Sequence, residues 1–157
     1  MVRFKNRYFT VEIVPEQCQG LYTEAFPLKD HEILRSVLTT TEQIHGEFGA
    51  AAVTNGLNVK YCNEHTRIAV IRARHGPHQL VASSLPFLSR IANKKVQIRG
   101  VYCGATMTKC FKFLQKYHRE KLNEAFTSCK NQESKEKLTH IMSKINYMTK
   151  GNNKKEG

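Results

Sequence analysis

The residues of this chain with the clearest chemistry are its lysines and arginines, which are concentrated in one stretch. Residues 65–119 contain 11 Lys or Arg and four of the seven His, with no Asp or Glu. Residues 12–64 carry eight acids against three bases. Because a stretch without acids cannot neutralise its own charge, we expect this surface to meet a polyanion, of which a phosphate backbone is the commonest for a small basic protein. The alternative is a solvated basic face on an ordinary domain.

Several of these bases are candidates for phosphate contacts, and Arg suits this work because its planar guanidinium can grip two phosphate oxygens. Six to ten such contacts would give steeply salt-dependent binding with little sequence preference, which is typical of a protein that holds a structured RNA. Base stacking across the predicted sheet is not expected, because residues 68–74 contain no aromatic side chain. The candidate RNA-binding residues are Arg3, Lys5, Arg7, Arg67, Arg72, Arg74, Lys94, Lys95, Arg99, Lys109, Lys112, Lys116 and Arg119.

The sequence indicates no catalytic residue, cofactor or metal site. Nuclease chemistry usually needs clustered carboxylates that hold Mg²⁺, and the basic stretch has none. The candidate zinc ligands, Cys62-x-x-His65 and Cys103 with Cys110, lack a matching second pair at a recognised spacing. No phosphate-binding glycine loop or nucleophile elbow occurs. His75 and His78 flank a Gly-Pro turn and are expected to lie in solvent.

Length and composition indicate one domain over residues 1–149, followed by a flexible polar tail at 150–157. The chain has 157 residues, of which 40% are hydrophobic, and no Pro/Gly/Ser-rich linker interrupts the pattern. No apolar run approaches 18 residues, so no membrane span is expected. Five cysteines without a C-x-x-C pair favour reduced thiols inside the cell over a disulfide framework.

The hydrophobic periodicity gives the order of the elements that must position the bases. Period-two alternation predicts four strands, at residues 8–14, 57–62, 66–74 and 96–103. Helical spacing predicts a helix from 28 to Gly46, a second from Gly76-Pro77 that kinks or ends at Pro86, a third that begins at 104–106, and a last one at 134–148.

Two local features of the first predicted helix are specific enough to test. Asp30 is its predicted N-cap, and Gly46 is predicted to terminate it. The small-residue segment 46–52 is then predicted to be a tight turn whose aromatic anchor, Phe48, fills the core. The Gly46-x-x-Gly49 spacing is also that of a KH-type phosphate clamp, but Glu47 has the wrong charge for it.

Together these elements predict an α+β sandwich. The order β-α-β-β-α-β, followed by two helices, is that of the split βαβ, ferredoxin-like or RRM-like antiparallel sheet, which many RNA-binding domains use. In that topology the first strand neighbours the third, so the bases at the N-terminus would lie beside those of the hairpin.

Specific segments resemble a known family. They are MVRFKNRY at residues 1–8, HGEFGAA at 45–51, YCN at 61–63, IRAR at 71–74 and SLPF at 84–87, followed by GAT at 104–106 and the helix through Tyr117-His118-Arg119. In this order they resemble the small basic processing-of-precursors (Pop) subunit shared by eukaryotic ribonuclease P and ribonuclease MRP. The resemblance covers about residues 1–122.

The resemblance implies an RRM-like sandwich in a nuclear and nucleolar ribonucleoprotein whose RNA performs the cleavage. That RNA removes 5′ leaders from precursor tRNA, or cuts precursor rRNA in the MRP particle. The implied partners are the catalytic RNA, a TIM-barrel-like protein subunit and other subunits, with precursor tRNA met indirectly. The basic segments of the family fall on Arg3, Lys5, Arg7, Arg72 and Arg74. Some members end in an acidic tail, whereas residues 150–157 here are basic, so nothing about tail function transfers.

Two other functions stay open at this point. One is a free-standing RNA-binding or ribosomal-type protein; an exposed apolar patch would favour an obligate subunit over it. The other is a small metal-dependent nuclease, which cleavage of precursor tRNA by the purified protein alone would establish.

Overall fold

The computed structural model describes residues 4–16, 26–128 and 136. The chain divides into two compact units, Met1–Cys110 and Phe111–Gly157. The first unit holds the sheet and the helices that cover it, and the described part of the second is most of one long helix. The single domain over residues 1–149 stays a prediction. The tail at 150–157, and the helix predicted at 134–148 apart from residue 136, lie outside the described residues.

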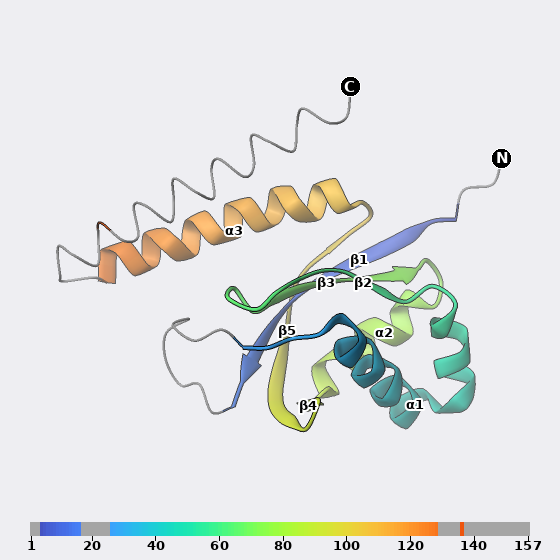
Figure 1. Ribbon diagram of the computed structural model, residues 1–157. Coiled ribbons are helices and arrows are strands. Elements are labelled where there is room, and N and C mark those ends of the chain that lie inside the picture. Colours follow the sequence, from blue (N-terminus) through green and yellow to red (C-terminus); the bar gives the residue numbers. More distant parts are fainter. Residues whose placement is uncertain (1–3, 17–25, 129–135, 137–157) are drawn as a thin grey trace. The chain divides into compact units, whose positions relative to one another are not determined.

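The first unit is built on an antiparallel sheet in the order β2-β3-β1-β5-β4 (Figure 1). Its strands are β1 (Asn6–Pro15), β2 (Asn58–Asn63), β3 (Ile68–Arg74), β4 (Arg90–Ile91) and β5 (Lys94–Gly104). The long strands β2, β3, β1 and β5 have the split βαβ arrangement that the sequence predicts. The α+β fold class and the pairing of the first strand with the third are therefore confirmed.

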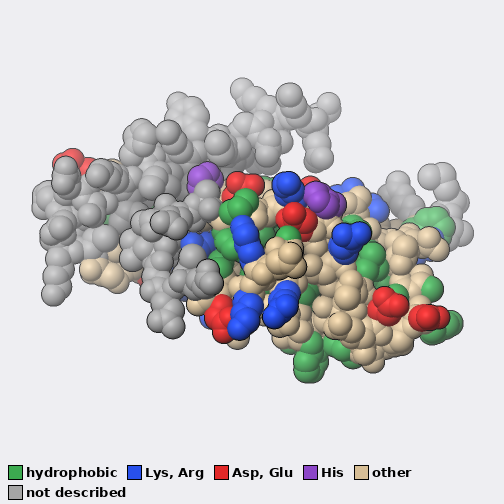
Figure 2. All heavy atoms as spheres, turned by 60° about the horizontal axis from the view of Figure 1, so that its bottom comes forward, with side chains coloured by type: hydrophobic (Ala, Val, Ile, Leu, Met, Phe, Trp, Pro, Cys, Tyr) green, Lys and Arg blue, Asp and Glu red, His purple; other side chains and the backbone are tan. Residues whose placement is uncertain are grey.

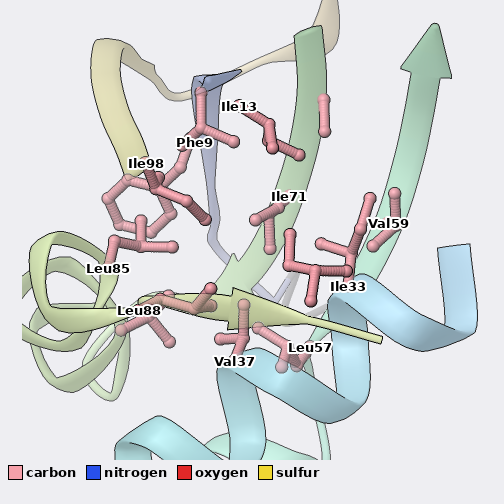
Figure 3. Close-up of a cluster of buried hydrophobic side chains, with 14 of the residues drawn as sticks. Phe9, Ile13, Ile33, Val37, Leu57, Val59, Ile71, Leu85, Leu88 and Ile98 are labelled. Carbon is pink, nitrogen blue, oxygen red and sulfur yellow. The ribbon is translucent and has the colours of Figure 1, made fainter. Parts of the chain in front are cut away.

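β1 lies in the middle of this sheet and organises the core. Its side chains alternate, so that Phe9, Val11 and Ile13 all lie in the buried cluster, as the period-two pattern predicts. Ile71 of β3 and Ile98 of β5 join them from the neighbouring strands. Figure 3 shows Phe9, Ile13, Ile71 and Ile98 converging with side chains of the helices below the sheet.

Two helices cover this face of the sheet (Figure 1). In the longer one, α1 (Asp30–Thr54), Ile33, Val37 and Val53 are buried at helical spacing. The predicted cap is wrong by one residue: Lys29 occupies the N-cap position with extended dihedrals and no side-chain cap. Asp30 instead stands in the first turn, where its charge is favourable to the helix dipole.

The prediction for the segment after Gly46 is wrong. Gly46 does leave the helical conformation, with φ 72° and ψ −177°, but the helix resumes beyond it and continues to Thr54. The alanines at 50–52 are the strongest helix formers, so the chain returns to helix after one glycine kink. Phe48 is consequently on the outside of the second helical segment, 87% exposed, and does not fill the core.

β2 and β3 form the predicted hairpin, and Asn63 shapes its turn. The Asn63 side-chain oxygen accepts hydrogen bonds from the backbone N–H groups of His65 (2.9 Å) and Thr66 (3.1 Å). Arg67 follows with a left-handed φ of 55°. Because the turn extends through these residues, β3 begins at Ile68, two residues later than predicted.

The second half of the sheet is reached through a short helix, α2 (His78–Ser84), and a 3₁₀ turn, η1 (Leu85–Phe87). Pro86 stands within that turn, so the predicted break at this proline is confirmed. The two-residue strand β4 forms a tight hairpin with β5. This strand is not predicted from the sequence. Its turn uses positive φ at Ala92 (47°) and Asn93 (64°), and the alanine gives no signal for such a turn.

The last described element is α3 (Met107–Ser128), which follows β5 almost directly. The first turn of α3 belongs to the same unit as the sheet, and Cys110 Sγ lies 3.8 Å from the Tyr8 carbonyl oxygen. A Cβ at Gly104 would come within 2.9 Å of Cys110 Sγ and of Tyr102, so glycine permits this close approach. Among the described residues, no helix is long and apolar enough to cross a membrane.

Candidate nucleic-acid interface

The sheet brings basic residues from two distant parts of the sequence to one end. In the β1–β3 register Asn6 is opposite Arg74 and Tyr8 is opposite Arg72. Lys5 is joined to the same end, because its carbonyl oxygen accepts the N–H of His75 at 2.8 Å. We call Lys5, Arg7, Arg72 and Arg74 the basic end. Since neighbouring residues on a strand project to opposite faces, Arg7 and Arg72 place charge on both sides of the sheet here.

The charges of the basic end have no acidic partner among the described residues. The ion pairs among the described residues all involve other lysines and arginines. They are Lys95–Glu16 (3.4 Å), Arg99–Glu12 (3.6 Å), Lys116–Glu120 (3.8 Å) and Lys121–Glu124 (3.1 Å). Arg7 makes one polar contact, from Nη1 to its neighbour's carbonyl oxygen at 3.3 Å. Positive charge at this end is therefore available to an outside anion.

Arg72 and Arg74 differ in how they are held. Arg72 is half-buried between Asn58 of β2 and Tyr8 of β1, and its Nε is buried with no hydrogen-bond partner among the described residues. Arg74 carries its guanidinium 3.9 Å above the centre of the Phe4 ring. The ring is 71% exposed, and its contact with the guanidinium is a cation–π contact.

Two histidines lie beside the basic end: His75 is in the turn after β3, and His78 is the first residue of α2. Their rings stack, with centroids 4.9 Å apart, and the Gly76 N–H donates to Nδ1 of His78 at 3.1 Å. Burial, the neighbouring His75 and then Arg7 lower the pKa of His78 below its ordinary value. His75 is exposed, as predicted, but His78 is half-buried and not in open solvent.

Arg67 is predicted from the sequence to be an exposed RNA-binding residue, but it does not lie on the surface. It is 5% exposed, and its carbonyl oxygen accepts the N–H of Ile13 at 2.8 Å. The reason is the left-handed turn before β3, which places this residue against β1. Arg3 lies outside the described residues.

A second group of candidate bases lies on β5. Lys94, Lys95 and Arg99 are exposed, but Glu16 and Glu12 partly neutralise the last two. Lys94 holds its ammonium 4.7 Å from the centre of the Phe26 ring. In the view from the side of α1, Lys and Arg stand among Asp and Glu (Figure 2), so charge of both signs is present on that face.

The remaining candidates are on α3. Lys109, Lys112, Lys116 and Arg119 are all exposed, and their spacing of three, four and three residues places them along one side of the helix. Lys109 belongs to the unit of the sheet, whereas the other three belong to the second unit. Their stripe is therefore described only as a feature of the helix itself.

The described residues contain no group of three or more His, Cys, Asp or Glu side chains close enough to share a metal ion. Of the proposed zinc ligands, Cys62 is half-buried, and burial followed by Asp30 and Glu64 raises its pKa to about 11. Cys110 is buried and Cys103 exposed, and burial raises both pKa values. Thiols with raised pKa values are poorly nucleophilic at neutral pH.

Sequence reasoning located the bases of this end but missed the two aromatic contacts within it. Phe4 stands between bases in the segment MVRFKNRY, and His78 follows Gly76-Pro77. An aromatic residue inside a basic segment is a signal that was available. The contact between Phe4 and Arg74 could not be predicted from the sequence, because the two residues are seventy positions apart and only the strand register brings them together.

The fold and the basic end define a class: a small split-βαβ domain with uncompensated arginines at one end of its sheet. Residues 7–115 match the model of the Rpp14/Pop5 family. This match covers more than half of the sequence, and the chain belongs to the Rpp14/Pop5 family.

Curated relatives agree with this assignment. The chain is 33% identical over 142 residues to "Ribonuclease P/MRP protein subunit POP5" of Danio rerio, covering 87% of this chain and 82% of that protein. It is 34% identical to the Homo sapiens protein of the same name, covering 88% and 85%. A chain of the yeast ribonuclease MRP cryo-EM structure aligns with a TM-score of 0.48 at 13% identity, over 80% of this chain and 97% of that one.

Proposed function

We propose that this chain is a protein subunit of a ribonuclease P/MRP ribonucleoprotein, in which it binds and braces RNA while the RNA performs the cleavage. The observation that carries the proposal is the identity of about one third with proteins named as ribonuclease P/MRP subunits, over more than four fifths of both partners. The particle would remove 5′ leaders from precursor tRNA and process precursor rRNA. Its nuclear and nucleolar location, and its pairing with a TIM-barrel-like subunit, belong to the same proposal.

The basic end supports RNA binding. Lys5, Arg7, Arg72 and Arg74 lie at one end of the sheet, and none has an acidic partner among the described residues. Guanidinium groups bind phosphate oxygens in a fork geometry, and each phosphate contact contributes to affinity by releasing counterions. Lys94, Lys95, Arg99 and the stripe on α3 would add contacts of the same kind, whereas the buried Arg67 would not.

The non-catalytic role of the chain belongs to the same proposal. Metal-dependent phosphodiester cleavage uses side chains that gather around one or two cations, and the described part of the chain brings no three such side chains together. The four bases of the basic end provide charge but no paired acid and base. We therefore assign them to binding.

The test is isolation of the full chain, tagged at its C-terminus, from cells that express it, followed by sequencing of the attached RNA. One abundant structured RNA should be enriched, and the eluate should cleave precursor tRNA at its 5′ leader. Digestion of the RNA with micrococcal nuclease, then chelation of the Ca²⁺ that nuclease needs and readdition of Mg²⁺, should abolish the cleavage while leaving the protein intact.

Two results would contradict the proposal. A broad set of unrelated RNAs in the eluate would favour the free-standing RNA-binding protein. Cleavage of precursor tRNA by the recombinant chain alone would establish a protein nuclease and remove the role of the RNA.

A further inference from the structure

The exposed aromatic ring at the basic end is the feature of this molecule that phosphate binding does not use. Phe4 is 71% exposed although the Arg74 guanidinium lies 3.9 Å from its ring centre. With one face of the ring covered by that contact, an exposure this high leaves most of the remaining ring surface to solvent. A large apolar ring with one face against a cation and the other open to solvent is a stacking surface.

Two other phenylalanines are as exposed as Phe4 but, in the described part of the chain, lack its cationic partner. Phe48 and Phe87 are 87% and 70% exposed, yet among the described residues neither ring has a cation above it. Phe48 lies on α1 directly after Glu47, where a phosphate chain would be repelled. Phe4 is followed by Lys5 and lies against Arg74, so phosphates and a base can be bound at the same place.

We propose that Phe4 and Arg74 form a platform on which one unpaired base of the RNA stacks, while the other cationic side chains of the basic end bind the adjoining phosphates. Sequence-tolerant binding of single strands combines these two elements, an aromatic ring and a basic track, because every base has a π-face. The guanidinium of Arg74 covers one face of the ring, so the base would stack on the other face. The platform would therefore select an unpaired nucleotide over a duplex. The inference rests on the proposed RNA binding and adds the kind of RNA feature that this end binds.

The platform differs from the one the sheet would offer. In the common RNA-binding sheet, bases stack on aromatics of the two central strands. Here β3 contains none, and β1 has the half-buried Tyr8 opposite Arg72. The ring of the proposed platform belongs to Phe4, which precedes β1. Its partner Arg74 belongs to the neighbouring strand β3, where it is paired with Asn6. The proposed stacking is therefore at the end of the sheet and not on its central strands.

The experiment compares two RNA probes with the full-length chain. The first is a 12-nucleotide single strand of mixed sequence carrying 2-aminopurine, and the second is a 12-base-pair blunt duplex. Phe4→Leu should weaken binding of the single strand about 5- to 100-fold and remove the quenching of 2-aminopurine, since loss of base–aromatic stacking has effects of this order. It should leave duplex affinity and the salt dependence unchanged, because no charge is removed.

The matched control is Phe48→Leu, which makes the same change at an exposed ring on α1 and should alter neither affinity. Arg74→Lys is a second variant: it keeps the charge but removes the planar group, so it should weaken the single strand selectively as well. Circular dichroism establishes that each variant is folded.

The outcomes separate the platform from the function on which it rests. If the parent chain binds neither RNA, the proposed RNA binding fails and the platform with it. If the parent binds and Phe4→Leu binds the single strand equally well, only the platform is overturned. Loss of the Phe4→Leu chain from the purified particle, with normal single-strand binding, would assign the ring to a protein contact and also overturn the platform.

Discussion

At the scale of single residues, Arg7 of the basic end and the two neighbouring histidines would repel one another if all three were charged. Arg7, His75 and His78 lie together, and burial, followed by the charges of His75 and Arg7, lowers the pKa of His78. His78 therefore stays neutral in the folded protein at pH values where a free imidazole begins to bind a proton. This neutrality limits the repulsion that the folded state must tolerate.

A pH dependence of stability follows. The folded-state pKa of His78 lies below its unfolded value of 6.5, so between these two values the unfolded chain binds more protons. The contribution of His78 to stability is therefore complete above pH 6.5 and is lost as the pH falls through the folded-state pKa. NMR titration of the His78 ring should give a pKa below 6.5, and His78→Gln should reduce the loss of urea resistance between pH 8 and pH 5.

The neighbouring histidine provides the control for this titration. His75→Gln removes one of the named causes, so the pKa of His78 should move back toward its ordinary value without reaching it. A titration of His78 at or above 6.5 in the parent chain would contradict the environment described for this ring.

At the scale of elements, the kink in α1 decides which side chains face outward. Gly46 has φ 72° and ψ −177°, a combination essentially restricted to glycine. A Cβ built there would meet nothing within 4 Å, so the demand for glycine comes from the backbone alone. The second helical segment takes its direction from this residue and carries Phe48 into solvent.

Gly46→Ala should therefore destabilise the protein by about 1–3 kcal/mol, the usual strain of a non-glycine residue in such a conformation. Urea unfolding monitored by circular dichroism measures it. Gly100→Ala on β5 is the control, since its Cβ would also meet nothing within 4 Å and its backbone does not require glycine. A more stable and more helical Gly46→Ala variant would mean that an unkinked α1 is accessible at no cost.

The elements also show how far the sequence determines this structure. The period-two and helical patterns predict β1, β2, β3, β5 and the three helices, because each buries one regular face. The departures occur where local chemistry is ambiguous. Gly46 resembles a helix end but is a kink, and the β4 hairpin turns through an alanine with positive φ. For the candidate site, charge counting finds the bases, whereas the burial of Arg67 and the Phe4–Arg74 stack depend on tertiary register.

At the scale of the whole molecule, the unequal distribution of charge along the sequence is partly corrected in three dimensions. Acids from the N-terminal third reach bases of the acid-free stretch: Glu12 pairs with Arg99 and Glu16 with Lys95. The basic end receives no such acid from the described residues. The positive charge of β5 is therefore partly neutralised by glutamates, whereas that of the basic end is not, and the net charge of +12 does not show this difference.

This difference gives a test in which the total charge is held constant. Arg72→Ala with Arg74→Ala, and Lys95→Ala with Arg99→Ala, each lower the net charge from +12 to +10. The first pair should weaken RNA binding and flatten the plot of log affinity against log salt by roughly 0.7–0.9 for each phosphate that the protein no longer neutralises. The second pair should flatten it less, because its charges are already compensated by glutamates. Fluorescence anisotropy over a salt series, with thermal unfolding as the check on folding, separates the two. An equal or larger effect of the second pair would move the RNA to β5 and leave the basic end without the role given to it here.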